Sequence, residues 1–305
     1  MQPLKSSFDQ ETSAALKAVD ELMVSLLTCQ LSNSSRGAVY QLASGGKRTR
    51  AILALFCSRH LDLDYESSVS LAALCELLHN ASLIHDDIQD HTEMRRGKPS
   101  VWKKYGTDVA ICSGDLMISA AFASTARINS LYSSLALTHI HSIISEVICG
   151  QALDLSLRNK SNISPDEYID IVEKKTGGLL GLPIELAFIY SGKAEFISLI
   201  KQCVRAFALA YQIYDDIEDS KDDEFEGNLN IINIMIEKST SAVAIKEAKN
   251  LAANSMTISR NLAKKIPYGC GDILLELSKH VSHAKTPHNA ISMETNTLSA
   301  SIHSH

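Results

Sequence analysis

The sequence carries the same short acidic motif twice, each time at the end of a long apolar stretch. The motif is D-D-x-x-D, and its members are Asp86, Asp87 and Asp90 in the first copy and Asp215, Asp216 and Asp219 in the second. On a helix, residues three or four positions apart share a face. Carboxylates gathered in this way repel one another unless a cation lies among them. Two such clusters predict two walls of one cavity bridged by divalent metal, and hard oxygen ligands suit Mg²⁺.

The apolar pattern predicts an all-α chain. Residues 67–91 and 196–218 are apolar almost all round, which is typical of helices inside a core, and each ends in one acidic motif. Amphipathic spacing predicts further helices over 8–31 and 239–265. Two more helices are expected within 107–157, with a break near residues 129–134.

Local signals mark where some of these helices begin. Ser164 as N-cap, Pro165 at the first helical position and Glu167 at the third predict a helix start. The polar stretches 32–37 and 91–99 are expected to be loops.

Length and composition favour one large helical domain. The chain has 305 residues, 45% of them hydrophobic, and its 6 prolines and 14 glycines do not gather into a linker. We expect a single all-α domain over 1–284 and a polar, disordered tail over 285–305. The net charge of −6 disfavours nucleic acid as a partner, because binding it needs a basic stripe.

Cysteine usage and the lack of targeting signals predict a soluble, cytoplasmic protein. The seven cysteines are odd in number and form no C-x-x-C pair, so we expect reduced thiols and neither disulfides nor a zinc site. The N-terminal sequence lacks the charged and apolar regions of a signal peptide. No uninterrupted apolar run reaches the roughly 18–20 residues that a membrane span requires.

Two basic stretches accompany the acidic motifs. Their members are Lys47, Arg48 and Arg50, which follow the pair Gly45 and Gly46, and Arg95 and Arg96. Glycine lets backbone approach a ligand closely, and N–H groups at a helix start favour phosphate. Arginine adds a two-pronged donor for phosphate oxygens. Either stretch alone is typical of solvated surface, but combined with two acidic clusters they predict an enzyme that binds diphosphates.

Six motifs, in order, resemble those of the trans-isoprenyl diphosphate synthases, also called polyprenyl synthetases. Residues 45–50 resemble the family's G-G-K-R-x-R, residues 79–90 its H-x-x-S-L-x-H-D-D-x-x-D, and residues 95–99 its R-R-G-x-P. Residues 113–115 resemble its G-D element, residues 175–177 its K-T-G, and residues 211–219 its F-Q-x-x-D-D-x-x-D. The resemblance implies an isoprenoid synthase-type helical bundle around a central apolar cavity.

The resemblance also implies an activity, substrates and site residues. The reaction would be head-to-tail condensation of isopentenyl diphosphate with an allylic diphosphate, in a homodimer, giving a short-chain trans-polyprenyl diphosphate. The six aspartates would bind Mg²⁺, as three ions with bound diphosphate. Arg95 would contact the allylic diphosphate, and isopentenyl diphosphate would be held by Lys47, Arg50, His79 and Arg96. Lys175, Thr176 and Gln212 would lie along the reacting carbons.

Several of these residues have a plainer interpretation without the family pattern. His79 on an apolar helix is typical of a core histidine with one hydrogen bond, and Lys175 is typical of surface. Gln212 lies within an apolar helix, where a polar side chain must find a partner.

One departure follows the second acidic motif. The family usually carries Gly-Lys there, and Asn228 stands where that lysine is expected. Lys221 is the only nearby base and lies too early to replace it. Weaker metal closure, a different substrate and an altered role are the alternatives that this leaves open.

Product length is expected to depend on the residues below the first motif. Ser82 and Ala81 lie four and five residues before Asp86 and are small, and Leu78 lies about one turn deeper. A turn is about 5.4 Å, close to the length of one isoprene unit. Met117 adds bulk from a neighbouring helix. The sequence therefore predicts a product longer than ten carbons, with farnesyl or geranylgeranyl chains favoured.

Two other functions compete with prenyl transfer. A class I terpene cyclase would need a different second metal motif and has no need of the basic stretch at 45–50. A regulatory subunit of a heteromeric synthase tends to lose an acidic motif, whereas both are intact here, although Asn228 keeps this alternative open.

Overall fold

The structure is a computed structural model that describes residues 2–158, 160, 162–226, 229–236 and 239–284. Side chains are described from residue 11 on, except those of 219–226 and 282–284. The chain forms two compact units: unit 1 is Met1–Leu137 with Leu186–Lys193, and unit 2 is Thr138–Glu185 with Ala194–His305. The single domain expected over 1–284 stays a prediction, and the tail 285–305 lies outside the described residues.

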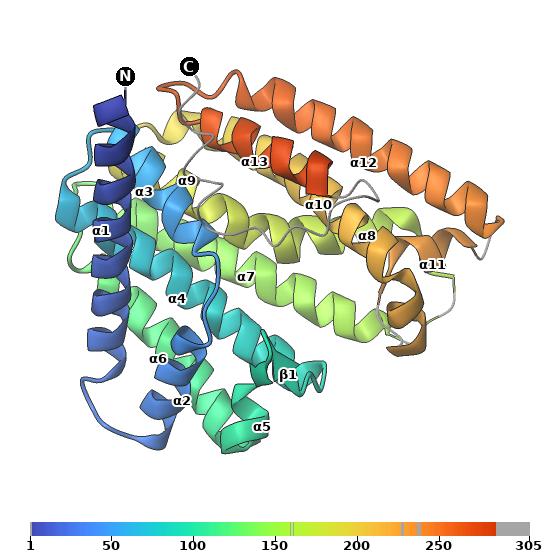
Figure 1. Cartoon of the computed structure of the whole chain (residues 1–305), viewed down its shortest axis with the longest axis horizontal. Helices are drawn as coiled ribbons and strands as arrows, with labels where there is room; N and C mark the ends of the chain where they lie inside the picture. Colours follow the sequence, from blue (N-terminus) through green and yellow to red (C-terminus); the bar gives the residue numbers. More distant parts are fainter. Residues whose placement is uncertain (1, 159, 161, 227–228, 237–238, 285–305) are drawn as a thin grey trace. The chain divides into compact units, whose positions relative to one another are not determined.

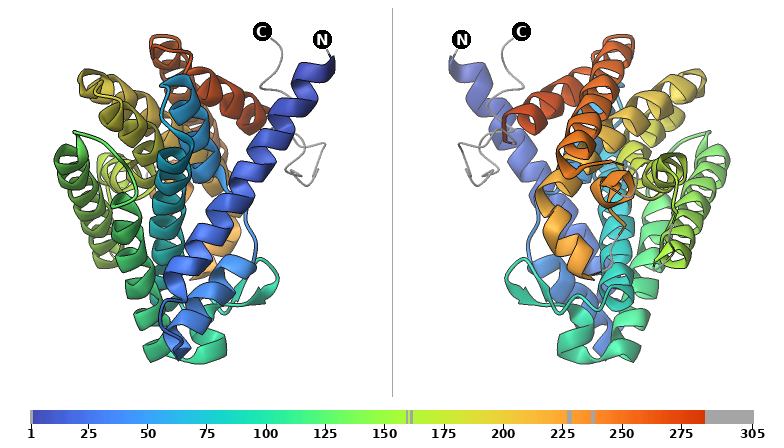
Figure 2. Two further views of the ribbon diagram at one scale, coloured as in Figure 1. Left: turned by 90° about the vertical axis from the view of Figure 1, so that its left-hand side faces the viewer. Right: turned by 90° about the vertical axis from the view of Figure 1, so that its right-hand side faces the viewer.

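Unit 1 is built around helix α4 (Tyr65–Gln89). The helices that contact it include α1 (Gln2–Leu27), α2 (Asn33–Ala43), α3 (Thr49–His60), α5 (Val101–Tyr105) and α6 (Thr107–Thr125) (Figure 1). Helix α1 crosses α3 and α4 (Figure 2). Asp64 caps α4 by accepting a hydrogen bond from the Ser67 backbone N–H at 2.8 Å, and this bond lowers the pKa of the Asp64 carboxyl.

Helix α4 is long and apolar enough to cross a membrane by length and composition alone. However, 83% of its most apolar window is buried inside the structure, so α4 is a core helix of unit 1. This agrees with the sequence prediction that residues 67–91 form a helix inside the core.

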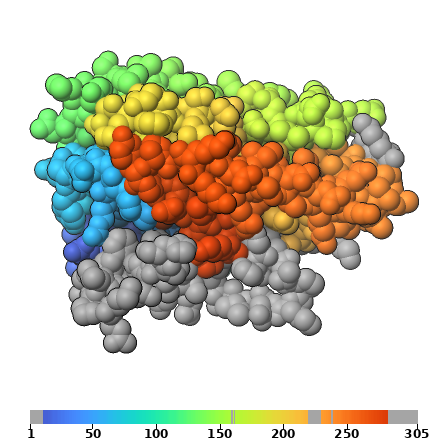
Figure 3. Space-filling model, turned by 90° about the horizontal axis from the view of Figure 1, so that it is seen from above, coloured from blue at the N-terminus to red at the C-terminus, as the bar shows by residue number. Residues whose placement is uncertain are grey.

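Unit 2 is built around helix α10 (Ile197–Glu226). Its contacts come from α8 (Pro165–Val172), the π-helix η1 (Glu173–Gly177), the 3₁₀ helix η2 (Ala194–Phe196), α11 (Ile231–Ile236) and α12 (Ser241–Ala263). Helices α12 and α13 (Asp272–Ala284) lie side by side, in orange and red in Figure 3. Arg260 on α12 donates to the side chain and the carbonyl of Ser278 on α13, at 2.8 and 2.9 Å. Two further helices, α7 (Ser133–Leu157) and α9 (Gly178–Tyr190), have residues in both units.

The all-α prediction is confirmed, as are several of its boundaries. The break expected near 129–134 separates α6 from α7. Ser164 and Glu167 form the expected reciprocal capping box, with Pro165 opening α8. The structure describes all seven cysteines, and it pairs none of them in a disulfide.

Two stretches expected to be loops carry regular structure instead. Residues 32–37 open α2, because Ser32 caps the helix and exchanges hydrogen bonds with Ser35. Residues 91–99 contain a hairpin of two short antiparallel strands, β1 (Met94–Arg95) and β2 (Lys98–Pro99). The two turn residues, Arg96 and Gly97, have φ of 52° and 74°, as a type I′ hairpin turn requires.

Candidate active site

The first acidic motif lies at the C-terminal end of α4 in unit 1. Asp86 is half-buried, and Asp90 is exposed and forms the helix C-cap. A helix C-terminus already carries partial negative charge, so carboxylates placed there are destabilising without a cation. This position favours cation binding at Asp86 and Asp90.

Asp87, between them, is held by Arg95 from the hairpin. The Arg95 Nε donates to both Asp87 carboxylate oxygens at 2.8 and 2.9 Å, and Nη2 donates to Oδ1 at 2.6 Å. The Asp87 side chain is only 1% exposed, and a buried carboxylate needs such a partner. The hairpin is therefore fixed to the end of α4, with Arg95 beside the first acidic motif.

The two basic stretches meet at the Gly-Gly pair. Gly45 and Gly46 have φ of 90° and 142°, and the Arg96 guanidinium donates to the Gly45 carbonyl. A Cβ at Gly46 would lie 2.8 Å from Arg96 Nη1, so a side chain there would displace the guanidinium from this position. Lys98 also donates to the Ala43 carbonyl at 3.2 Å. The hairpin thus docks on the loop that leads into α3.

His79 lies among the arginines of this cluster. It is partly buried on α4, and its pKa is lowered well below 6.5, first by burial and then by the charges of Arg50, Arg96, Arg95 and Arg48. The imidazole is therefore neutral at pH 7. The pKa of Arg96 is also lowered, by burial and then by its arginine neighbours, as expected where cations crowd a site for an anion.

Glu76 is a member of this cluster that the sequence analysis missed. It is 2% exposed on α4, and its Oε1 accepts hydrogen bonds from the backbone N–H groups of Arg50 and Ala51 at 3.0 and 3.1 Å. These N–H groups at the start of α3 were expected to favour phosphate, and Glu76 occupies both of them. The sequence feature that could have identified Glu76 is its place as a lone glutamate in an otherwise apolar stretch, because a buried charge needs a partner.

His85 and the 113–115 motif also come together in unit 1. His85 Nε2 lies 3.7 Å from Asp115 Oδ1, and a Cβ at Gly114 would collide with the His85 ring. The close approach of α6 to the end of α4 therefore explains the glycine in this motif.

The second acidic motif lies on α10 in unit 2. Asp215 is half-buried, Asp216 is 3% exposed, and Asp219 is in α10 but its side chain is outside the described residues. Asp216 accepts hydrogen bonds from Gln212 Nε2 at 3.0 Å and from the Ile231 backbone N–H at 2.9 Å. This supplies the partner that Gln212 was expected to need.

Asn230 completes the attachment of α11 to the motif. Its Nδ2 donates to the Asp216 carbonyl at 2.8 Å, and its Oδ1 accepts from the Ile232 N–H at 2.8 Å. Asn228 and the side chain of Lys221 lie outside the described residues. The three alternatives raised by Asn228 therefore stay predictions.

Lys175 and Thr176 lie in the π-helix η1. A π-helical turn is rare and is often found at functional sites. Lys175 is partly buried and its Nζ lies 2.8 Å from Oδ2 of Asp154 on α7, which decides against the plain surface interpretation. Asp154, 7% exposed, is a second residue that the sequence analysis missed, and its signal was again an acid in an apolar helix.

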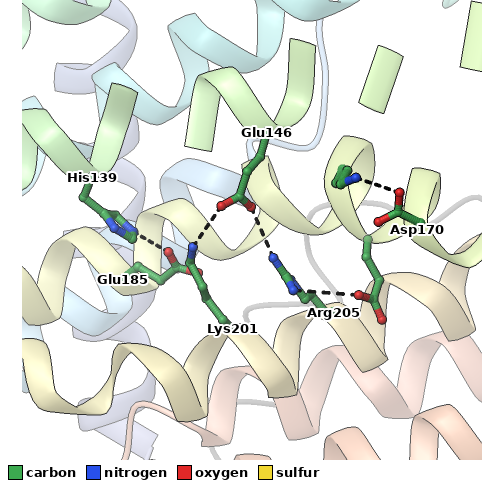
Figure 4. Close-up of polar contacts among 8 residues, drawn as sticks. His139, Glu146, Asp170, Glu185, Lys201 and Arg205 are labelled. Carbon is green, nitrogen blue, oxygen red and sulfur yellow. Dashed lines mark hydrogen bonds and ion pairs between the residues drawn. The ribbon is translucent and has the colours of Figure 1, made fainter. Parts of the chain in front are cut away.

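A polar network joins η1 to its neighbours in unit 2 (Figure 4). Glu146 on α7 accepts from Lys201 at 3.4 Å and from Arg205 at 3.2 Å, both on α10. Arg205 also lies 3.8 Å from Glu173 in η1. These side chains are 24–38% exposed, so each pair contributes little energy and mainly fixes orientation.

The residues proposed to set product length lie in the interior of unit 1. Ala81 and Leu78 are 1% and 4% exposed, and Met117 on α6 is fully buried. Ser82 is partly buried, and its hydroxyl donates to the His79 carbonyl at 2.8 Å.

The donor set fits Mg²⁺ held together with a substrate. Among the described residues, no three histidine, cysteine, aspartate or glutamate side chains converge closely enough to hold a metal ion alone. Mg²⁺ at phosphate sites usually binds through one or two carboxylates, several waters and the phosphates themselves. Asp86 and Asp90 provide such carboxylates beside the arginine cluster.

Comparison with known proteins extends these motifs to most of the chain. Residues 34–267 match the family model described as polyprenyl synthetase. Over 191 residues the chain is 34% identical to the short chain isoprenyl diphosphate synthase of Methanothermobacter thermautotrophicus, covering 62% of this chain and 59% of that protein. Over 187 residues it is 31% identical to the geranylgeranyl pyrophosphate synthase of Geoglobus acetivorans, covering 60% and 59%. The match thus spans 59% of the length of each relative.

Solved structures show the same fold. The geranylgeranyl pyrophosphate synthetase from Geoglobus acetivorans matches with a TM-score of 0.80 at 26% identity, covering 89% of this chain and 99% of that one. The heptaprenyl diphosphate synthase from Staphylococcus aureus, 20% identical, matches in fold with a TM-score of 0.78, covering 90% and 99%. The isoprenoid synthase-type all-α fold is confirmed. Since the family model covers residues 34–267, the chain belongs to the polyprenyl synthetase family.

Proposed function

We propose that the chain is a prenyltransferase that condenses isopentenyl diphosphate head-to-tail with an allylic diphosphate. The observation that carries the proposal is the cluster in unit 1, where His79 and four arginines gather beside the aspartates that end α4. Groups for an anion and for a cation are adjacent there, which suits a diphosphate bound with Mg²⁺. The names of the relatives, short chain isoprenyl and geranylgeranyl diphosphate synthases, support this reaction class.

The proposed reaction breaks the allylic C1–O bond, forms a carbon–carbon bond to C4 of isopentenyl diphosphate and removes a proton from C2. Mg²⁺ bound at the aspartates would neutralise the charge that develops on the leaving diphosphate. Arg95, fixed by Asp87, adds a positive charge beside that group and needs no reorganisation during the reaction. The released diphosphate accepts the proton, so no side chain is required as the base.

The basic cluster is proposed to hold the diphosphate of isopentenyl diphosphate. Lys47, Arg50 and Arg96 would supply charge, whereas His79, being neutral, would supply one N–H donor. Lys175, Thr176 and Gln212 are proposed to lie along the reacting carbons, where backbone and side-chain dipoles stabilise an allylic cation. Metal binding by all six aspartates, including the buried Asp87 and Asp216, stays a prediction.

A mixture of purified protein, Mg²⁺, isopentenyl diphosphate and an allylic diphosphate of five, ten or fifteen carbons tests the proposal. We expect diphosphate release and a longer prenyl diphosphate. Asp86→Asn is expected to lose this activity, whereas Asp108→Asn, which changes an exposed aspartate in the first turn of α6, is the matched control and should keep it. No diphosphate release with any of the three substrates would refute catalysis and support a regulatory subunit, the alternative raised by Asn228.

We further propose a product of fifteen to twenty carbons. Ala81 is small and fully buried one turn below the first acidic motif, so a larger side chain there would shorten the space for a growing chain. Ala81→Phe is expected to shift the product towards ten to fifteen carbons, read by chromatography of the dephosphorylated alcohols. An unchanged product length would show that Ala81 does not line the channel.

A homodimer is proposed from the family resemblance. Helix α6 in unit 1 exposes two large apolar side chains, Ile111 at 44% and Phe122 at 37%, which supports an association through this helix. Light scattering after size-exclusion chromatography should give twice the chain mass, and a monomer at micromolar concentration contradicts the proposal.

A further inference from the structure

Glu76 is a buried carboxylate whose hydrogen bonds cap the start of helix α3. It lies on α4 among leucines, at 2% exposure, and an unpaired charge in that position would be strongly destabilising. Its Oε1 accepts two backbone hydrogen bonds, from Arg50 and Ala51, at 3.0 and 3.1 Å. Both donors belong to the first turn of α3, 25 and 26 residues away along the chain.

Helix α3 has no cap of its own. Its N-cap residue, Arg48, is in the left-handed conformation with φ of 49° and makes no side-chain capping bond. The first N–H groups of a helix have no partner within the helix and need one elsewhere. Glu76 supplies that partner, and its negative charge also suits the positive end of the helix dipole.

The turn that Glu76 holds carries the basic stretch. Lys47 and Arg48 lead into α3, and Arg50 is in its first turn, so the backbone that Glu76 fixes sets where these side chains start. Glu76 also lies one turn before His79 on α4. Its negative charge raises the pKa of Arg96, whereas burial and the charges of Arg95 and Arg48 lower it. Glu76 thus lies behind the cluster, between α3 and α4.

We propose that Glu76 is a positioning residue for the site that holds the diphosphate of isopentenyl diphosphate. It holds the first turn of α3 against α4, so that Lys47, Arg50, His79 and Arg96 face one anion together. The inference rests on the proposed function for the identity of the substrate. A consequence is that the Arg50 and Ala51 N–H groups are occupied, so the diphosphate is bound by side chains and not by this pair of backbone donors.

Two substitutions separate positioning from charge. Glu76→Gln keeps an oxygen that can accept both backbone hydrogen bonds, whereas Glu76→Leu keeps the volume and removes the acceptor. Ser70→Ala is the matched control, because Ser70 is a fully buried polar residue on the same helix whose hydroxyl has no partner among the described residues. Folding of each variant is checked by circular dichroism and thermal unfolding.

The first measurement is binding of inorganic diphosphate in EDTA, which requires neither turnover nor Mg²⁺. We expect Glu76→Leu to weaken binding by at least about tenfold, the scale expected when a charge-assisted hydrogen bond is lost, with Glu76→Gln within about threefold and Ser70→Ala unchanged. Wild-type binding in Glu76→Leu overturns the inference. Equal losses in Glu76→Gln and Glu76→Leu would assign the effect to charge and also overturn it.

The second measurement is steady-state kinetics. Glu76→Leu is expected to raise the KM for isopentenyl diphosphate while kcat and the KM for the allylic substrate change less than about twofold. A uniform fall in kcat, as from general loss of structure, counts against positioning. If the wild-type protein makes no product, the proposed function fails, and the EDTA binding series still decides the role of Glu76.

If Glu76→Leu does not fold, Glu76→Asp takes its place. The shorter side chain draws the carboxylate back by one methylene and weakens the two backbone hydrogen bonds without removing the charge. Weaker diphosphate binding is then expected, and unchanged binding overturns the inference.

Discussion

Replacing Asp216 with alanine is expected to destabilise unit 2 even when no metal or substrate is present. The Asp216 carboxylate is 3% exposed and accepts from Gln212 Nε2 at 3.0 Å and from the Ile231 N–H at 2.9 Å. Ile231 is itself fully buried and opens α11, so its N–H has no access to water once the carboxylate is removed. The substitution therefore leaves a buried donor without an acceptor.

The magnitude follows from these two bonds. A hydrogen bond to a charged group contributes about 1.5–3 kcal/mol, and an orphaned buried donor costs about 1–3 kcal/mol. Gln212 is only partly buried and can turn to water, and loss of one carboxylate relieves repulsion from Asp215. We therefore expect the free energy of unfolding to fall by about 2–4 kcal/mol, with most of it due to the Ile231 N–H.

Urea unfolding in EDTA, followed by circular dichroism, measures this change. Asp216→Asn keeps an oxygen acceptor for Ile231 and should lose less than half as much. Glu247→Ala, which changes an exposed acid on α12 of the same unit, is the matched control and should change stability little. The reasoning is refuted if Asp216→Ala unfolds within about 0.5 kcal/mol of wild type, or if Glu247→Ala costs as much.

Three further outcomes are expected. The folded-state pKa of His79 lies well below 6.5, so at acid pH the unfolded chain binds a proton at His79 that the folded chain does not. The free energy of unfolding should therefore fall as pH drops below about 6.5, by at most about 1.4 kcal/mol per pH unit. His79→Gln should remove this part of the pH dependence in urea unfolding, and an identical profile in the variant contradicts the prediction. Tyr190→Phe should leave the melting temperature unchanged or raise it. The Tyr190 hydroxyl is buried without a partner among the described residues, and burial raises its pKa to about 12. A clearly lower melting temperature would mean that the hydroxyl is hydrogen-bonded. Gly46→Ala should weaken inorganic diphosphate binding in EDTA more than Gly97→Ala, because both have positive φ but only a Cβ at Gly46 meets Arg96; equal losses would trace the effect to backbone strain alone.

Local signals made much of the fold predictable from the sequence. The helix around residues 67–89 follows from its apolar composition, and the start of α8 follows from three residues, Ser164, Pro165 and Glu167, whose interactions are local. The loop predicted at 32–37 was wrong because Ser32 and Ser35 can serve either a turn or a capping box, and the following apolar positions of α2 decide between them. The hairpin at 94–99 was missed because its strands are only two residues long, too short for any periodicity.

The candidate site was predictable by residue type and less so by contact. The motifs identified Arg95, Arg96 and His79, but no spacing rule could indicate that Arg95 pairs with Asp87 or that Glu76 caps α3, because these contacts depend on how α4 packs in unit 1. Glu76 and Asp154 were visible only as single acids within apolar helices. Such residues are the best available signal, because burial of a carboxylate implies a partner that the chain must supply.

The spacing of the repeated D-D-x-x-D gives its aspartates two different roles, cation binding and attachment of the next segment of the chain. On a helix the first and fifth positions of the motif lie on the same face, whereas the second is rotated by about 100° towards a different face. In the first copy this leaves Asp86 and Asp90 accessible and buries Asp87 against Arg95, which fixes the hairpin that follows.

The second copy also has one half-buried and one buried aspartate, but the buried one has different partners. Asp215 is half-buried, and Asp216 is buried against Gln212 and the first N–H of α11, the segment that follows α10. Helix α11 also packs its apolar residues with Leu209 and Ile213 of α10, so the bond at Asp216 and the apolar contacts hold the same segment. In each copy the second aspartate thus attaches the next segment of chain to the helix that presents the motif. A substitution there should therefore disturb structure and cation binding together.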